Sequence, residues 1–146
     1  MAKLNGDLAI EIPFKIDFTD FVVTGRIDAV QQWHSTNAIT VVDYKTGSRK
    51  DEAYRQLGTY KVGLEELYGI PVTHGRYFYT KKNIKTQLMT GSSEWIDLTR
   101  YTKDYLREQY ATLKRARENN IYLAAPSRDK CGMCSVKKLC PEMSGR

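Results

Sequence analysis

The chain places one acidic residue on a predicted strand and an acid-x-lysine pair on the next. The two segments are Gly25-Arg26-Ile27-Asp28 and Asp43-Tyr44-Lys45-Thr46-Gly47. Residues two apart in a β-strand point to the same face, so Asp43 and Lys45 project together, with the Tyr44 carbonyl near them. Asp28 can meet them from the neighbouring strand. The spacing therefore predicts a cluster of two carboxylates and one ammonium.

Such a cluster has a definite chemistry. Two carboxylates and a backbone carbonyl form a hard oxygen site for Mg²⁺ or Mn²⁺, and Mg²⁺ keeps several waters and takes phosphate oxygens of a substrate as further ligands. Lys45 beside that metal could orient or deprotonate the attacking water and offset charge on the phosphorus. An Asp-x-Lys pair alone is more often solvated or self-paired, so further features must support this interpretation.

The elements that would position these residues follow from the hydrophobic pattern. Strands are predicted at 8–16, 21–32, 38–44, 74–79 and 85–90, and helices at 51–68 and 98–119. The first two strands form a hairpin, and the last two form another around Lys81-Lys82-Asn83. The predicted order is βββαββα, followed by a loop-like tail, and it indicates an α/β fold with a mixed sheet flanked by helices.

Composition narrows the class of protein. With 146 residues, 41% hydrophobic and 27% charged, the chain suits one globular domain rather than a disordered or membrane protein. It has no apolar run long enough to span a bilayer and no secretory signal, so we expect a cytoplasmic protein. The net charge of +6 favours a polyanionic partner such as DNA.

The three cysteines lie close together near the end of the chain. Cys131, Cys134 and Cys140 are an odd number in one short stretch, which favours metal or iron–sulfur ligation in a reducing compartment over a disulfide framework. A 4Fe–4S cluster or a structural zinc normally has four protein ligands, so a fourth must come from elsewhere.

Four segments, in this order, resemble the RecB-like exonuclease branch of the PD-(D/E)xK nuclease superfamily, which includes the exonucleases of CRISPR adaptation. They are Gly25-Arg26-Ile27-Asp28, Asp43-Tyr44-Lys45-Thr46-Gly47, Gln56-Leu57-Gly58-Thr59-Tyr60 and Cys131-x2-Cys134-x5-Cys140-Pro141. The first two match the metal-binding motifs of the family, the third its Gln-x3-Tyr motif, and the last the trailing cysteines of its iron–sulfur members.

The resemblance implies a restriction-endonuclease-like fold and hydrolysis of DNA, by default from single-stranded ends. Asp28 and Asp43 would be metal ligands and Lys45 the catalytic lysine. Gln56 and Tyr60, which share a helix face, would help hold the DNA, although the apolar stripe of that helix equally predicts Tyr60 in the core. Glu11 is a further candidate ligand because related nucleases often carry a glutamate ahead of Gly-x-x-Asp.

The chain also departs from the family. Members usually begin with a helix that supplies a histidine and the first cysteine, and neither has a counterpart here. We therefore expect either a piece of a longer nuclease, of bacterial, archaeal or viral origin and working in a larger polypeptide or complex, or a compact variant. The predicted nuclease core covers residues 1–125, and residues 126–146 form a cysteine-bearing extension packed on it. A non-catalytic DNA-binding or scaffolding relative, an inactive fragment and a basic single-strand-binding module are the alternatives.

Overall fold

A computed structural model describes residues 3–4, 7–33, 36–46, 54–82, 89–92, 94–121, 131–135 and 137–140. By its internal contacts the chain divides into two compact units, Met1–Gln109 and Tyr110–Arg146. The first unit contains the sheet and the predicted catalytic residues.

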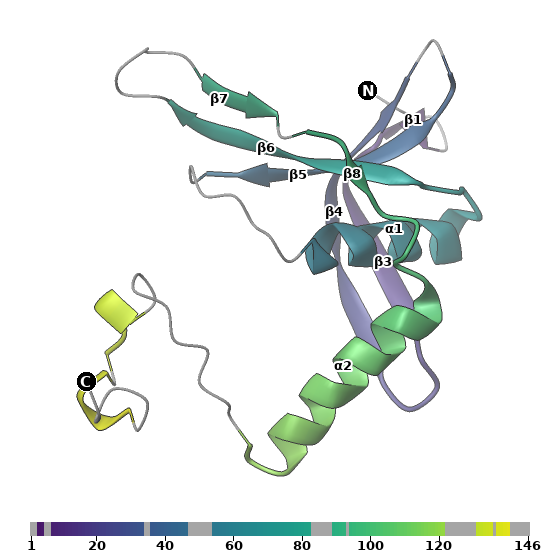
Figure 1. The fold of residues 1–146 in the computed structure, drawn as a ribbon. Coiled ribbons are helices and arrows are strands. Elements are labelled where there is room, and N and C mark those ends of the chain that lie inside the picture. The colour runs from purple at the N-terminus through teal and green to yellow at the C-terminus, as the bar shows by residue number, and fades with distance from the viewer. Residues whose placement is uncertain are drawn as a thin grey trace. The chain divides into compact units, whose positions relative to one another are not determined.

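The first unit is built on a mixed sheet with the strand order β3-β4-β5-β6-β7, and β8 pairs with β6 (Figure 1). The strands of this sheet are β3 (Ile10–Asp17), β4 (Val22–Gln32), β5 (Ile39–Lys45), β6 (His74–Lys82), β7 (Met89–Ser92) and β8 (Ile96–Asp97). A separate two-stranded pair, β1 (Lys3–Leu4) with β2 (Asp7–Leu8), precedes it. The helices are α1 (Arg55–Tyr68) and α2 (Lys103–Glu118), and a short 3-10 turn, η1, covers Lys137–Leu139.

The directions of the strands agree with the predicted mixed sheet. β3, β4 and β5 are consecutive antiparallel neighbours, whereas β5 and β6 are parallel and are joined through α1. β6 pairs antiparallel with β7, as expected for the second hairpin, whose connection at 83–88 lies outside the described residues. The predicted α/β class with a mixed sheet is therefore confirmed.

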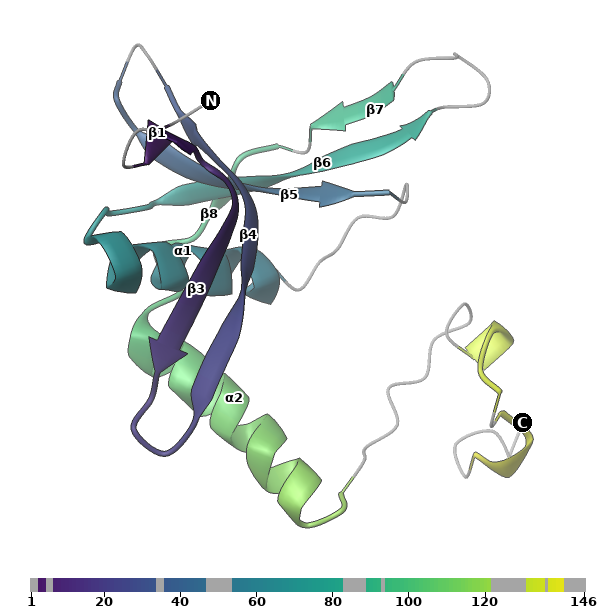
Figure 2. The same ribbon diagram turned by 180° about the vertical axis from the view of Figure 1, so that it is seen from behind.

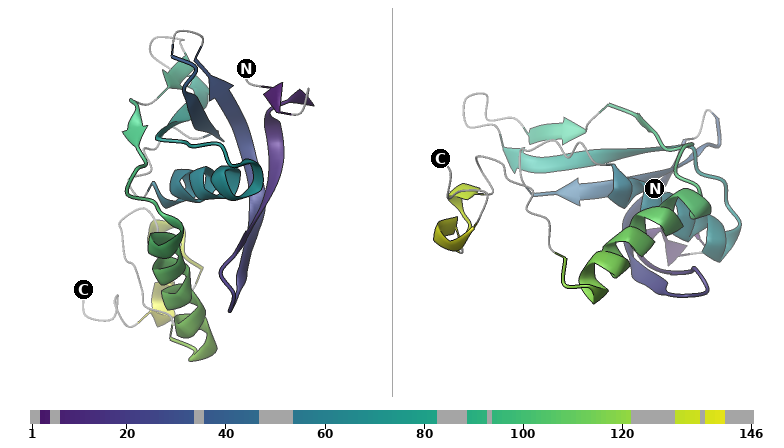
Figure 3. Two further views of the ribbon diagram at one scale, coloured as in Figure 1. Left: turned by 90° about the vertical axis from the view of Figure 1, so that its right-hand side faces the viewer. Right: turned by 60° about the horizontal axis from the view of Figure 1, so that its bottom comes forward.

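Helix α1 lies across one face of the sheet, over the β3–β4 hairpin and the central strands (Figures 2 and 3). Its core-facing residues Leu57, Val62 and Leu64 are almost completely buried. Two glycines allow close packing: a Cβ at Gly58 would lie 2.3 Å from the ring of Tyr101, and one at Gly63 would lie 2.7 Å from Phe14. Gly69 ends the helix with a φ of +66°, a left-handed conformation that glycine adopts without strain.

Strand β3 is irregular at Glu11, whose φ is +50°. Ile10 on one side of it is exposed, whereas Ile12 on the other side is buried. The positive φ twists the strand, so that side chains two positions apart no longer share a face.

The second helix starts later than predicted. Leu98 and Tyr101 have helical spacing and are both buried, but they flank a turn in which Asp97 Oδ1 accepts hydrogen bonds from the Thr99 amide and hydroxyl. The helix begins at Lys103, where the Thr102 hydroxyl accepts a hydrogen bond from the amide of the third helical residue. This N-terminal cap, and not the apolar spacing, sets the boundary. For α1, residues 51–53 of the predicted helix lie outside the described part.

The second unit contains the rest of α2 and the three cysteines. Successive backbone hydrogen bonds from Cys134 to Cys131, from Lys137 to Cys134 and from Cys140 to Lys137 form a series of turns. Within the described ranges, no helix is long and apolar enough to cross a membrane. The proposed boundary between a core and an extension near residue 125 stays a prediction.

Candidate active site

The structure brings Asp28, Asp43 and Lys45 together from two adjacent strands. Asp28 lies on β4, and Asp43 and Lys45 lie on β5. Lys45 Nζ is 2.9 Å from Asp43 Oδ2, and the backbone amide of Tyr44 donates a hydrogen bond of 2.9 Å to Asp28 Oδ2. Because β4 and β5 are antiparallel neighbours in the register Ala29–Val42, the two carboxylates face the same space.

Helix α1 closes this cluster with a ring of hydrogen bonds. Lys45 Nζ donates to Gln56 Oε1 at 2.5 Å, and Gln56 Nε2 donates to the Tyr60 hydroxyl at 3.1 Å. The Tyr60 hydroxyl in turn lies 3.2 Å from Asp43 Oδ1 and 3.3 Å from Asp28 Oδ1, so its single proton is shared between the two carboxylates. Tyr60 is thus both a core residue, as the apolar stripe suggested, and part of the site.

Burial dominates the electrostatics of Asp43, whose side chain is only 2% exposed. Loss of hydration raises the pKa of Asp43, the nearby ammonium of Lys45 opposes that rise, and the negative charge of Asp28 adds to it. Burial and the two carboxylates also raise the pKa of Tyr60, which keeps its hydroxyl protonated as a donor. The negative charge of Asp43 is therefore energetically unfavourable in the folded chain, and Lys45 and Tyr60 fix its position.

A comparison with protein families identifies the family of the chain. The sequence model of the PD-(D/E)XK nuclease superfamily matches residues 3–141. The chain belongs to the PD-(D/E)XK nuclease superfamily. Membership implies a nuclease, an enzyme that hydrolyses phosphodiester bonds. The match does not distinguish the RecB-like branch from the rest of the superfamily.

Two bacteriophage proteins are similar to this PD-(D/E)XK domain along nearly all of its length. The Gene 69 protein of Mycobacterium phage D29 is 32% identical over 139 residues, which are 94% of this chain and 49% of the phage protein. The Gene 69 protein of Mycobacterium phage L5 is 32% identical over 135 residues, 91% of this chain and 44% of the phage protein. The chain thus spans about half the length of these relatives.

PD-(D/E)XK nucleases typically use Mg²⁺ or Mn²⁺, and the donor set here fits such an ion. Asp43 Oδ2 is buried and accepts no hydrogen bond of good geometry within the described residues; its contact is the ion pair with Lys45. A buried carboxylate oxygen of this kind is what a hard cation would bind. Within the described part of the chain, no set of three or more His, Cys, Asp or Glu side chains is arranged to hold a metal ion.

Two other residues predicted to bind the metal, Glu11 and Tyr44, have different surroundings. The Glu11 side chain is exposed, and the hydrogen bonds and ion pairs of the cluster described above do not include it. The Tyr44 ring packs edge-on against Phe78 at 5.7 Å, while its amide serves Asp28. Coordination through Glu11 or the Tyr44 carbonyl stays a prediction.

Two aromatic residues of this PD-(D/E)XK site were not foreseen. The parallel register of β5 and β6 places Tyr77 beside Asp43, and Lys45 Nζ lies 5.2 Å from the centre of the Tyr77 ring. The Tyr54 ring lies 6.3 Å from that of Tyr77. Only the parallel pairing of β5 and β6 could have revealed Tyr77, because it is far from Asp43 in sequence.

The cysteines are free thiols in the structure: Cys134 is exposed, and Cys131 and Cys140 are half-buried. Metal binding by the three stays a prediction.

Proposed function

We propose that this chain is the catalytic part of a metal-dependent deoxyribonuclease that hydrolyses phosphodiester bonds, acting as an exonuclease on single-stranded ends. The observation that supports it most strongly is the closed ring of contacts among Asp43, Lys45, Gln56 and Tyr60, to which the Tyr60 hydroxyl also joins Asp28. Such a ring fixes two carboxylates and an ammonium in one small volume, as phosphoryl chemistry requires.

Asp28 and Asp43 would hold Mg²⁺ or Mn²⁺, with Glu11 and the Tyr44 carbonyl as further candidate ligands. When bound, the metal supplies Lewis-acid polarisation of the phosphate and lowers the pKa of water. The protein contributes the position of the two carboxylates: each is fixed through one oxygen by the Tyr60 hydroxyl, and Asp28 also by the Tyr44 amide.

Lys45 would act on the phosphate and on the attacking water. Its side chain is 28% exposed, and its ammonium contacts both Asp43 and Gln56, so the group is held in place but can be reached by substrate. A positive charge held there offsets the negative charge that develops on the phosphate oxygens, and a proton of the ammonium can be exchanged with water.

Gln56 and Tyr60 would have two roles. They would position the catalytic groups, and they would help to hold the DNA. Gln56 accepts from Lys45 and donates to Tyr60, so it sets the direction of the ammonium. Gln56 is exposed, which allows the same amide to contact a nucleotide at the site. This role is more specific than the DNA contact expected from the sequence motif alone.

DNA as the substrate is supported by the net charge of +6 and by superfamily membership. We further propose that the domain works within a larger polypeptide or complex in recombination or repair, in the manner of RecB-like exonucleases. The length of the phage relatives supports the larger polypeptide. A 4Fe–4S cluster, or zinc as the alternative, would be held by Cys131, Cys134, Cys140 and a fourth ligand.

The test is cleavage of end-labelled single-stranded DNA with Mg²⁺, Mn²⁺ or EDTA. Asp28→Ala, Asp43→Ala and Lys45→Ala should each abolish cleavage and keep the circular dichroism spectrum of a folded protein. Arg107→Gln, which removes an exposed surface charge, is the control and should cut normally. Undiminished cleavage by folded Asp43→Ala would rule out this site. DNA binding without metal-dependent cleavage would favour the non-catalytic alternative.

A further inference from the structure

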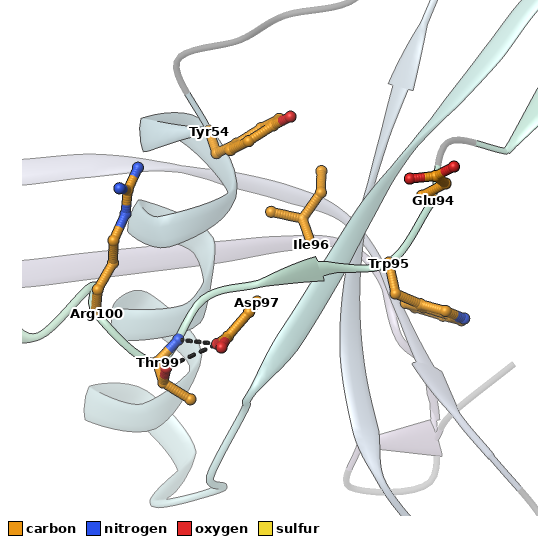
Figure 4. A pocket seen from close by; sticks show the side chains of 7 residues that line it. All are labelled: Tyr54, Glu94, Trp95, Ile96, Asp97, Thr99 and Arg100. Atoms are coloured by element: carbon orange, nitrogen blue, oxygen red, sulfur yellow. Dashed lines mark hydrogen bonds between the residues drawn. The ribbon is translucent and has the colours of Figure 1, made fainter.

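A groove next to the candidate active site has no role in the scheme above. It has a volume of about 420 Å³ and is lined by Tyr54, Glu94, Trp95, Ile96, Asp97, Thr99 and Arg100. Figure 4 shows that its residues come from the start of α1 and from the segment around β8. The volume lies within the range of about 300–1,000 Å³ that is typical of small-molecule sites.

Neighbouring side chains connect the groove to the candidate active site. Tyr54 lines the groove, its ring lies 6.3 Å from Tyr77, and Lys45 Nζ lies 5.2 Å from the centre of the Tyr77 ring. Tyr54 is also only two residues before Gln56. A nucleotide adjoining a phosphate at Lys45 would therefore be within reach of Tyr54.

The lining of the groove suits the parts of a nucleotide. Tyr54 and Ile96 offer an aromatic and an apolar surface for a base, whereas the Trp95 ring points away from them (Figure 4) and packs against Trp33 and Arg76. Arg100 is exposed, and its guanidinium donates one hydrogen bond of 2.8 Å to the Tyr101 hydroxyl, out of five N–H groups that such a side chain carries. Among the groups of DNA, the phosphate is the one whose geometry and charge the guanidinium matches.

The two acidic residues fit the same interpretation. Asp97 and Glu94 are exposed at the groove, and Asp97 Oδ1 is held by the amide and hydroxyl of Thr99. Carboxylates beside an aromatic surface can accept hydrogen bonds from the N–H groups of a base. A wholly basic groove would bind phosphate alone, whereas this mixed lining matches a complete nucleotide.

We infer that the groove formed by Tyr54, Ile96 and Arg100 is a subsite for the nucleotide of single-stranded DNA adjacent to the scissile phosphate, with the base on Tyr54 and a phosphate at Arg100. This assignment rests on the proposed nuclease function. It would make the groove the place where the chain grips its substrate before cleavage, separately from the residues that perform the chemistry.

The chain provides its own reporter for this site. Its two tryptophans are Trp33 and Trp95, whose rings lie 5.2 Å apart, and Trp95 lines the groove. In a Trp33→Phe background, tryptophan emission comes from Trp95 alone. Adding hexathymidylate or thymidine monophosphate, with no divalent metal present, should change this emission in a saturable manner. Anisotropy of labelled hexathymidylate measures binding independently.

Substitutions then locate the binding. Tyr54→Leu removes the aromatic surface but keeps apolar bulk, and it should weaken hexathymidylate binding about 5- to 150-fold, the range found for loss of one base–aromatic stack. Tyr54→Phe should bind like the parent, and Arg100→Gln should weaken binding. The matched controls are Tyr68→Leu, about 20 Å away at the other end of α1, and Arg107→Gln, and both should retain the affinity of the parent.

The outcomes separate the groove from the nuclease function. If labelled DNA binds but folded Tyr54→Leu and Arg100→Gln both bind like the parent, the groove is not the subsite, whereas metal-dependent cleavage can still stand. If the emission responds and both variants lose affinity, the subsite is supported even in a protein that does not cut. If neither nucleotide nor DNA binds, the subsite is overturned.

Discussion

Burial of the Asp43 carboxylate has a cost for folding that depends on pH. Its pKa is raised in the folded chain, so the folded state binds the proton more tightly than the unfolded state does. The stabilisation from this proton is complete below the ordinary aspartate pKa and is lost as pH rises through the raised pKa. At neutral pH the charged Asp43 therefore destabilises the fold.

This leads to a prediction for Asp43→Asn. The variant should lose cleavage but melt at a higher temperature at neutral pH, by on the order of a few degrees, since about 1 kcal/mol corresponds to about 4 °C for a chain of this size. Thermal unfolding from acidic to neutral pH measures it: the advantage of the variant should grow as pH rises. A variant that melts lower than the parent across this range would contradict the burial argument.

Gln56 is expected to affect the chemical step more than affinity. Its amide holds the Lys45 ammonium at 2.5 Å, and misplacing a reacting group by about 1 Å can lower a rate on the order of 100-fold. Gln56→Ala should therefore cut slowly in single-turnover assays at saturating enzyme, where weak binding no longer matters, and Arg107→Gln should cut like the parent. Wild-type rates for Gln56→Ala under these conditions would make Gln56 an affinity contact at most.

The sequence predicted which residues of the candidate site lie together, because two-residue periodicity decides which side chains share a strand face. Asp43 and Lys45 follow that rule, and Asp28 lies on the adjacent strand. Tyr60 could not be assigned to the core or to the site, because a phenol has an apolar ring and a polar end and here uses both. Tyr77 depends on a long-range parallel register that local patterns do not contain.

At the scale of elements, the two glycines of α1 set how closely the helix approaches its neighbours. Replacing glycine by alanine inside a helix normally stabilises it by roughly 0.5–1 kcal/mol. At Gly58 the new Cβ would meet the Tyr101 ring at 2.3 Å, so we predict that Gly58→Ala instead lowers stability by about 1–3 kcal/mol. Chemical denaturation measures the change.

The control for this prediction is a double-mutant cycle with Tyr101→Ala. Without the ring, Gly58→Ala should have its ordinary stabilising effect, and the difference gives the coupling between the two positions. A stabilising Gly58→Ala in the parent would show that α1 shifts at little cost.

The order of the main elements was predictable because each long strand and each helix carries its own period of apolar residues. The two-residue strand β8 has no such period, and it was missed together with the groove beside it. The predicted start of α2 failed for a related reason: Leu98 and Tyr101 imitate a helical face while a side-chain turn at Asp97 sets the backbone. Short polar contacts decided the structure there.

At the scale of the whole molecule, we predict that the intact chain, purified without oxygen, contains iron and sulfide bound through Cys131, Cys134 and Cys140. Visible absorption and elemental analysis are the measurements, and each single Cys→Ser variant should lose the signal. Stoichiometric zinc would leave a structural metal and discard the cluster. Absence of any metal from the anaerobic protein would discard both.

The order of the functional residues along the chain has a consequence for how such domains can diverge. Asp28, Asp43, Lys45, Gln56 and Tyr60 lie within one continuous stretch, whereas most of the groove comes from the later segment Glu94–Arg100. Mutation or recombination downstream of α1 can therefore alter the proposed nucleotide subsite and leave the candidate catalytic residues untouched. Selection can tune substrate choice in one stretch of the gene while it holds the cutting chemistry constant in another.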